Sequence, residues 1–286
     1  MRVLVTGAAG QLGAELAGAL APLGEVTGTG RAELDLADPS AIAAFVRELR
    51  PALIVNAGAY TAVDLAEKEA ALAHAVNAVA PGVLAEEAKR AGAVLVHYST
   101  DYVFDGTAGA PYAEDDPVNP VSVYGRTKLA GEAAVSQSGA DAIVLRTSWV
   151  YGRRGRNFLL TMQRLADEGR PIRVVDDQTG TPNWCRELAR ATARIVARGL
   201  PALADRRGLY HLTARGTTTW YGFARAILAD RPAVRIVPIA TAEYPTAARR
   251  PAWSVLDTGR FERTFGFALP HWTESLSECL VSPAAS

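Results

Sequence analysis

The chain has 286 residues, 49% of them hydrophobic, and its 30 lysines and arginines balance its 30 aspartates and glutamates. This length suits one compact domain, or a nucleotide-binding domain with a smaller lobe. The balanced charge argues against a nucleic-acid partner, and no apolar run is long enough to span a bilayer. Cys185 and Cys279 lack the spacing of a metal site, so we expect reduced thiols in a cytoplasmic protein.

A glycine-rich turn follows the first predicted strand. Residues 2–6 form a short apolar run typical of a buried parallel strand, and an alanine- and leucine-rich helix is predicted from Gln11. Gly7, Gly10 and Gly13 mark the junction, with the spacing GxxGxxG rather than GxGxxG. Gly7 allows the tight turn, Gly10 lets a pyrophosphate approach the helix N-terminus, and Gly13 lets helix and strand pack closely. This context predicts a dinucleotide site.

The second predicted strand, residues 25–29, bears on the choice of cofactor. It ends without an acid that could bind a ribose 2′-hydroxyl, and Arg31 follows it. An arginine there could pair with the 2′-phosphate of NADPH. A solvated loop arginine is an equally good interpretation, so we favour NADPH and leave NADH open. Asp35 and Leu36 come next and could line the adenine.

Strand and helix signals alternate through the first half of the chain. Further strands are predicted at residues 53–55, 94–98 and 142–146, with helices at 63–76, 81–91 and around Tyr124. This rhythm predicts an α/β fold with a Rossmann-like, doubly wound parallel sheet. Residues 1–150 would form the NAD(P)-binding domain, and residues 151–286 mainly a smaller substrate-binding lobe whose segments can return to the first domain. In the second part we expect helices at 157–168, 186–197, 221–229 and 259–265, and strands at 172–175, 209–212 and 234–238.

The pattern YGRTK places Tyr124 and Lys128 four residues apart, on one face of the predicted helix. A lysine beside a phenol favours the phenolate and lowers its pKa from about 10. Such a phenol can exchange a proton with a carbonyl oxygen near neutral pH. The pattern alone is weak, because a solvent-facing helix turn gives the same spacing. It gains weight from the nucleotide-binding pattern before it and from Ser99-Thr100-Asp101, which follows the fourth predicted strand.

Several stretches together resemble one family of enzymes. They are GAAGQLG at Gly7, NAGAYTAVDLAE at Asn56, HYSTDYVFDG at His97, YGRTKLAGE at Tyr124, LRTSWVYG at Leu145, NFLLTM at Asn157 and DDQTGTPNW at Asp176. Their content and order resemble the dTDP-4-dehydrorhamnose reductase family of the extended short-chain dehydrogenase/reductase superfamily. HYSTDYVFDG and DDQTGTP are quite specific to this branch. The last third of the chain matches less distinctly, through RRPAWSVLDTGR at Arg249.

The resemblance implies a reaction and roles for the catalytic residues. The C4 ketone of dTDP-4-dehydro-L-rhamnose would be reduced to dTDP-L-rhamnose by hydride from NAD(P)H. Tyr124 would protonate the ketone oxygen, and Thr100 would donate a hydrogen bond to the same oxygen. Lys128 would hold the nicotinamide ribose and lower the pKa of Tyr124.

The resemblance also implies two sets of binding residues. Gly10, Gln11 and Leu12 would lie along the pyrophosphate of the cofactor. The rest of the cofactor would be lined by Asp35, Leu36, Ala59, Tyr60, Thr61 and Tyr98. The sugar nucleotide would contact Asp101, Trp149, Asn157, Gln178, Thr179, Gly180 and Thr181.

Three other groups of residues have a structural interpretation beside a functional one. His97 suits a buried core histidine better than a catalytic base. Four tryptophans could stack a thymine, but core packing explains each of them better: Trp184, Trp220, Trp253 and Trp272. A basic stretch could attract a diphosphate or lie solvated in a loop: Arg153, Arg154 and Arg156.

The sequence leaves alternatives open for the oligomeric state of the protein and for its function. Some members of the family join two subunits through Mg²⁺ held by glutamates, and Glu15 and Glu187 fall where two such ligands would lie. Because surface acids are common, the metal and the choice between monomer and homodimer stay open. A ketoreductase for another dTDP-4-keto-6-deoxy sugar would have the same catalytic residues. A regulatory subunit resembling that of methionine adenosyltransferase is disfavoured by the intact Thr100, Tyr124 and Lys128, and an epimerase would retain NAD tightly.

Overall fold

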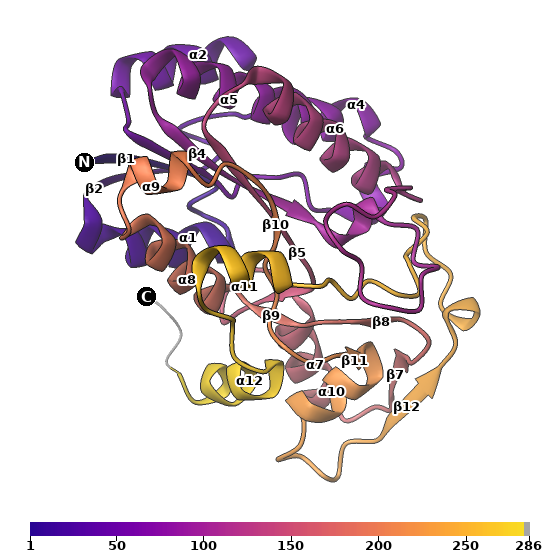
Figure 1. The fold of residues 1–286 in the computed structure, drawn as a ribbon. Coiled ribbons are helices and arrows are strands. Elements are labelled where there is room, and N and C mark those ends of the chain that lie inside the picture. Colours follow the sequence, from indigo (N-terminus) through magenta and orange to yellow (C-terminus); the bar gives the residue numbers. More distant parts are fainter. Residues whose placement is uncertain (283–286) are drawn as a thin grey trace.

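A six-stranded parallel sheet forms the centre of the protein, described by a computed structural model over residues 1–282 (Figure 1). The strand order is β10-β5-β4-β3-β1-β2. The strands are β1 (Arg2–Thr6), β2 (Glu25–Thr29), β3 (Leu53–Asn56), β4 (Val94–Thr100), β5 (Ala142–Thr147) and β10 (Gly208–His211). Every residue of β3, β4 and β5 is buried, which explains why these strands are rich in Val, Leu and Ile. The predicted Rossmann-like sheet is therefore confirmed.

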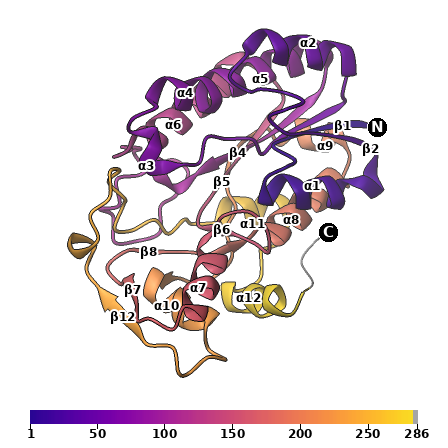
Figure 2. The same ribbon diagram turned by 180° about the vertical axis from the view of Figure 1, so that it is seen from behind.

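Helices cover both faces of this sheet. One face carries α2 (Pro39–Leu49), α5 (Ala80–Ala91) and α6 (Val123–Ser138), and the other carries α1 (Gln11–Leu20) and α8 (Cys185–Val196) (Figures 1 and 2). Side chains alternate along each strand and so divide between two apolar layers. Leu4, Ile54, Leu95 and Val144 belong to one layer, and Val3, Val5, Val55, Val96 and Leu145 belong to the other.

The helix predicted over residues 63–76 is interrupted in the structure. It consists of α3 (Val63–Ala66), α4 (Ala70–His74) and a π-helical turn (Ala75–Val79) that runs into α5. The break after α3 is a turn in which two successive N–H groups bond to the Leu65 carbonyl. Turns of the π type are frequent at functional sites.

The second half of the chain builds a smaller lobe from short elements and also returns to the central layer. Its remaining elements are β6 (Val150–Tyr151), α7 (Phe158–Asp167), β7 (Ile172–Val175), β8 (Thr179–Gly180), β9 (Asn183–Trp184), α9 (Leu200–Ala204), β11 (Thr218–Thr219), α10 (Trp220–Ile227), β12 (Ile236–Ile239), α11 (Gly259–Phe265) and α12 (Trp272–Val281). The sequence predicts neither α9 nor α12. In the lobe, β7 pairs with β12, β8 with β11 and β6 with β9. The strand expected at 209–212 is β10, which lies beside β5 in the central sheet, while α8 packs on α1.

Two further observations concern the lengths of the helices and the state of the two cysteines. Within residues 1–282, the helices are all too short or too polar to cross a membrane. Cys185 and Cys279 are free and buried. Burial raises the pKa of Cys185 to about 12 and that of Cys279 to about 11, so both remain protonated thiols at neutral pH.

Candidate active site

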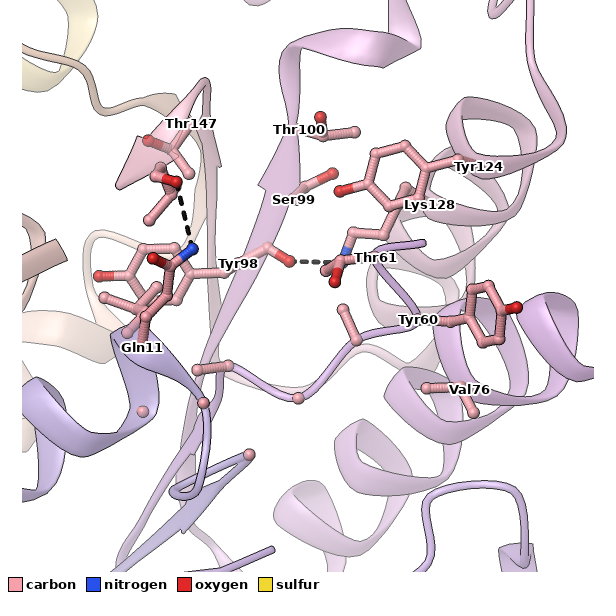
Figure 3. Close-up of a pocket in the computed structure, with 18 of the residues that line it drawn as sticks. Gln11, Tyr60, Thr61, Val76, Tyr98, Ser99, Thr100, Tyr124, Lys128 and Thr147 are labelled. Carbon is pink, nitrogen blue, oxygen red and sulfur yellow. Dashed lines mark hydrogen bonds between the residues drawn. The ribbon is translucent and has the colours of Figure 1, made fainter. Parts of the chain in front are cut away.

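A cavity of about 650 Å³ opens at the carboxyl ends of the central strands, where doubly wound sheets bind their ligands (Figure 3). The residues expected to contact the cofactor all line it: Gly7, Gly10, Gln11, Leu12, Gly13, Arg31, Asp35, Leu36, Ala59, Tyr60, Thr61, Tyr98, Tyr124 and Lys128. Three residues expected to contact the substrate, Thr100, Asp101 and Trp149, line the same cavity. The fold therefore brings the predicted cofactor residues together with part of the predicted substrate residues.

The turn between β1 and α1 is shaped for close approach of a ligand to the backbone. Gly7 has a φ of +70°, and a Cβ there would lie 2.6 Å from the Cα of Gly58. A Cβ on Gly13 would lie 2.1 Å from the Gly7 carbonyl oxygen, so helix and strand leave no room for one. Gly10 is the N-cap of α1, and none of the described side chains caps this helix end. Its free N–H groups fit the pyrophosphate of a dinucleotide cofactor.

The helix that carries Tyr124 and Lys128 is anchored at its start and along its inner face. Ser122 caps α6 by accepting a hydrogen bond from a backbone N–H at 3.1 Å. Lys128 is 2% exposed, and its Nζ donates a hydrogen bond to the Tyr98 carbonyl at 2.6 Å (Figure 3). Burial lowers the pKa of Lys128 to about 8, and the Glu132 carboxylate opposes this shift. At neutral pH the ammonium is still mostly charged.

The Tyr124 phenol lies beside Thr100 in the cavity wall (Figure 3). Burial raises the pKa of Tyr124 to about 12, a hydrogen bond with Thr100 lowers it in part, and the Asp101 charge raises it. The lowering by Lys128 that the spacing predicts is not seen: burial and the Asp101 charge raise the pKa of Tyr124, and the Lys128 ammonium is bound to the Tyr98 carbonyl. The phenol is therefore a protonated donor at neutral pH.

Asp101 is a buried carboxyl beside the hydroxyls of Thr100 and Tyr124. It is 2% exposed and accepts a hydrogen bond from the Thr100 hydroxyl at 2.9 Å. Burial raises the pKa of Asp101 to about 7, and hydrogen bonds from Ser254 and Thr100 offset only part of that shift. Near neutral pH the group is therefore divided between acid and carboxylate, and it can donate or accept a hydrogen bond.

Asn77, which sequence reasoning misses, fixes the loop of residues 59–61 to α6. It lies in the π-helical turn and is 1% exposed. Its Oδ1 accepts a hydrogen bond from the Tyr60 N–H at 2.8 Å. Its Nδ2 donates to the Tyr60 carbonyl at 3.1 Å and to the Thr127 hydroxyl at 3.2 Å. The signal in the sequence is slight, a single polar residue within the apolar stretch AVNAVA.

Two tryptophans form the rim of the cavity on the side of the smaller lobe. Trp149 and Trp220 stack with ring centroids 3.6 Å apart and planes inclined by 8°. Trp149 has a φ of +42°, which is strained for a residue with a side chain. Its indole lies on Gly180, where a Cβ would be 2.5 Å from a ring carbon. Trp220 and Arg156 are not among the predicted site residues, but both line the cavity.

Five residues expected to contact the substrate lie outside the cavity lining: Asn157, Gln178, Thr179, Gly180 and Thr181. Asn157 caps α7 by accepting a hydrogen bond from a backbone N–H at 3.1 Å. Gln178 donates a hydrogen bond to the Thr241 hydroxyl at 2.9 Å. Thr181 donates one to the Gly216 carbonyl at 3.0 Å. Thr179 lies in β8 and pairs with β11. In this structure the side chains of Gln178 and Thr181 bond within the smaller lobe, whereas the Asn157 amide also donates to the Gln11 side chain of α1 at 3.2 Å.

The glutamates considered as metal ligands are held by arginines. Arg186 donates to both carboxylate oxygens of Glu15, at 2.9 and 3.3 Å. Arg190 donates to Glu187 at 2.5 Å and to Glu278 at 2.9 Å. Among the residues that the structure describes, no three His, Cys, Asp or Glu side chains are grouped so as to hold a metal ion. Each of these glutamates is thus paired with an arginine within the chain, and a metal ion shared between two subunits stays a prediction.

Fold and site together are those of a short-chain dehydrogenase/reductase, a class of oxidoreductases built on a nicotinamide-binding sheet. Within this class the chain belongs to the family described as the RmlD substrate binding domain, whose model matches residues 1–284. It is 49% identical to the dTDP-4-dehydrorhamnose reductase of Burkholderia thailandensis over 98% of both chains. It is 46% identical to a probable dTDP-4,6-dihydroxy-2-methyloxan-3-one 4-ketoreductase of Streptomyces antibioticus, over 97% of this chain and 94% of the other. The structure of dTDP-4-dehydrorhamnose reductase from Bacillus anthracis in complex with NADP matches with a TM-score of 0.91 and 36% identity over 98% of both chains.

Proposed function

We propose that this protein reduces the C4 ketone of dTDP-4-dehydro-L-rhamnose to dTDP-L-rhamnose, with NADPH as the hydride donor. The observation that carries the proposal is the convergence of Thr100, Tyr124 and Lys128 on the cavity that also contains the glycine turn. The choice of substrate is supported by the names of relatives that match almost the whole chain.

The chain supplies the proton and the charge stabilisation for this reduction. A reduced nicotinamide, when bound, supplies the hydride. Tyr124 donates its phenolic proton to the ketone oxygen, and its pKa of about 12 keeps the proton in place until then. Lys128 lies one helical turn away and lines the same cavity, where its ammonium would hold the ribose of the bound nicotinamide.

Thr100 and Asp101 act from the end of β4. The Thr100 hydroxyl donates to the oxygen that becomes an alkoxide, an interaction whose removal costs about 10²–10³-fold in rate. This hydroxyl bonds to Asp101 in the structure and must turn toward the substrate. Asp101, whose pKa is about 7, then contacts a hydroxyl of the sugar as either donor or acceptor.

Residues at the end of β2 support NADPH over NADH. Arg31 is exposed and lines the cavity, where its guanidinium can pair with a 2′-phosphate. Glu33, an acid two residues further on, accepts the Gly30 N–H at 2.8 Å and is not among the residues that line the cavity. The relative from Bacillus anthracis was solved in complex with NADP.

A second candidate is the reduction of another dTDP-4-keto-6-deoxy sugar. It is favoured by the 46% identity to the probable 4-ketoreductase of Streptomyces antibioticus. Both reactions would use Thr100, Tyr124 and Lys128 in the same way. The difference lies in the shape of the sugar pocket, of which Trp149 and Trp220 form one side.

The test is the loss of reduced-nicotinamide absorbance after addition of freshly generated dTDP-4-dehydro-L-rhamnose, with NADPH and NADH compared and the product identified by NMR. We expect rapid oxidation of NADPH and formation of dTDP-L-rhamnose. Oxidation only with a different dTDP-4-keto-6-deoxy sugar would assign the second function. Protein that binds the cofactor but turns over no ketosugar would overturn both.

A further inference from the structure

A buried ion pair lies behind the catalytic helix and takes no part in the proposed proton transfer. Arg146 of β5 donates from Nε and Nη2 to the two carboxylate oxygens of Glu132 on α6, at 2.9 and 2.7 Å. The two side chains are only 3% and 9% exposed. Pairs buried in this way lose so much hydration that they often add nothing net to stability. A role in stability alone therefore does not account for the pair.

The pair lies where the catalytic helix is bound to β4. The Tyr98 carbonyl accepts a hydrogen bond from Lys128, and the hydroxyl of the next residue, Ser99, donates to Glu132 (Figure 3 shows the first of these). Tyr124, Lys128 and Glu132 follow one another at intervals of four residues, so they share one face of α6. Glu132 is thus the inner end of a row whose outer end is the proton donor.

We infer that Glu132 is a positioning residue for the proposed reaction: its carboxylate fixes the catalytic helix over β4 and keeps the buried Lys128 charged. The inference rests on the function proposed above, because that function gives Lys128 its role. Arg146 is the counter-ion that allows the carboxylate to stay ionised inside the protein.

The charges around Lys128 support this role for Glu132. Burial lowers the pKa of Lys128 to about 8, and the charge of Glu132 raises it. Other ionisable groups near this row are His97 and Tyr98 from β4, Asp101 and Tyr102 from the turn after it, Tyr124 from α6, Glu67 at the start of α6, Arg146 from β5, His211 from β10 and Tyr60 from the loop of residues 59–61. Among these groups and Glu132, the Glu132 carboxylate is the charge that raises the pKa of Lys128.

These groups do not replace Glu132 as the anion for the lysine. His97 is fully buried, and burial together with the Lys128 charge lowers its pKa well below the usual range, so it is neutral. Asp101 is only partly ionised near pH 7 and is bound by Thr100. The phenols are protonated, and Arg146 carries the wrong sign of charge.

The composition of the chain makes Lys128 easy to observe. The sequence contains three lysines, Lys68, Lys89 and Lys128, and the first two are exposed. With ¹³C at lysine Cε, NMR of the full chain gives three signals whose pH titrations report three ammonium groups. The Lys128→Met variant assigns the buried one. This titration needs no ketosugar, so its result is separate from the test of the proposed function.

The decisive variant is Glu132→Gln, which keeps the shape of the side chain and an acceptor for Ser99 but removes the charge. We expect the Lys128 titration to move to lower pH by about one unit, since an opposite charge one helical turn away is lost. Lys68 and Lys89 should not move. The alkaline limb of kcat/KM against pH should move down by the same amount while NADPH still binds.

A Lys128 titration that does not move overturns the inference. A shifted Lys128 titration in a protein that turns over no ketosugar leaves the electrostatic role of Glu132 in place and removes the proposed function. The two failures are therefore distinguishable.

Glu87→Gln is the matched control for the loss of a buried carboxylate. Glu87 is 4% exposed and pairs with Arg47 and Arg90 away from the cavity lining. Its loss should lower the free energy of unfolding without moving the titration of Lys128. A shift of equal size in this control would overturn the inference.

A double variant keeps the test available if Glu132→Gln does not fold. Glu132→Gln combined with Arg146→Met removes both buried charges, so that neither is left without its counter-ion. The Lys128 titration should still move to lower pH, but by less than in Glu132→Gln, because loss of the Arg146 cation acts in the opposite direction. An unchanged titration in the folded double variant overturns the inference.

Discussion

The cavity wall formed by β4 and α6 is more deeply buried than the rim formed by Trp149 and Trp220, and its side chains are held in a different way. In the wall, Lys128 and Asp101 are almost fully buried and hydrogen-bonded to neighbours in regular elements. The rim consists of two half-buried rings that stack on each other although they lie about seventy residues apart in the sequence. Proton transfer needs atoms held in fixed geometry, which a buried sheet supplies. Substrate choice can be left to side chains at the ends of elements, where changes do not disturb the sheet.

The largest expected effect comes from breaking the β4–α6 wall at its proton donor. Tyr124→Phe removes only the phenolic O–H and should lower kcat by about 10²–10⁴-fold, the usual worth of a general acid. Binding of NADPH, followed by fluorescence titration, should change little. Turnover close to that of the unmodified protein would remove Tyr124 from the mechanism.

A smaller effect is expected at the rim. Trp220→Leu removes a ring stack worth about 0.5–1.5 kcal/mol and leaves Trp149 unsupported, so KM for the sugar nucleotide should rise by up to about tenfold with kcat nearly unchanged. Trp253→Leu is a matched control, because the Trp253 indole donates to the Ala110 carbonyl at 2.8 Å and lies outside the cavity lining. A fall in kcat at constant KM would assign Trp220 to the catalytic wall instead.

Asp101 allows a further test of the comparison between wall and rim. Because its carboxyl is buried in the wall, the free energy of unfolding of the protein should depend on pH. Its pKa of about 7 in the folded protein lies above the usual 3.8, so the folded state binds the proton more tightly than the unfolded chain. The free energy of unfolding should therefore fall as the pH rises through this window, from about 4 to about 7. Asp101→Asn should match the parent Tm near pH 4 and exceed it by a few degrees at pH 8. Equal Tm differences at the two pH values would mean that the carboxyl ionises as an exposed one does.

The smallest effect is expected at the exposed end of the cofactor site. Arg31→Ala should raise Kd for NADPH by about tenfold, the equivalent of about 1.4 kcal/mol, and leave Kd for NADH nearly unchanged. The comparison is made by titration of both cofactors against the same protein preparation. Equal losses for the two cofactors would remove the argument for contact with a 2′-phosphate.

Much of the central layer could be predicted from the sequence. A strand buried on both faces must be apolar along most of its length, and β1, β3 and β5 appear as such runs. The glycine turn follows β1, as its role requires. The four-residue spacing of Tyr124 and Lys128 likewise depends only on the geometry of one helix.

The rest depends on contacts between residues that are distant in the sequence. Asn77 acts through Tyr60 and Thr127, and Trp220 acts through Trp149, so no local pattern marks either residue. The π-helical turn lies in the almost uniformly apolar stretch AVNAVA, where periodicity gives no signal that would reveal it. Spacing also predicts that Lys128 lies near Tyr124, but it does not predict that burial dominates the pKa of both groups.

The position of β10 in the central sheet determines how long the edge of β5 stays unpaired while the chain is synthesised. β10 completes the sheet beside β5, yet about sixty residues separate the two strands in the sequence. Ribosomes add about 5–20 residues per second, so the outer edge of β5 waits about 3–12 seconds for its neighbour. Throughout that interval a strand that will be buried on both faces offers unpaired N–H and C=O groups to other nascent chains. A ribosome stalled before residue 208 would therefore carry a chain with an exposed strand edge that is prone to aggregation.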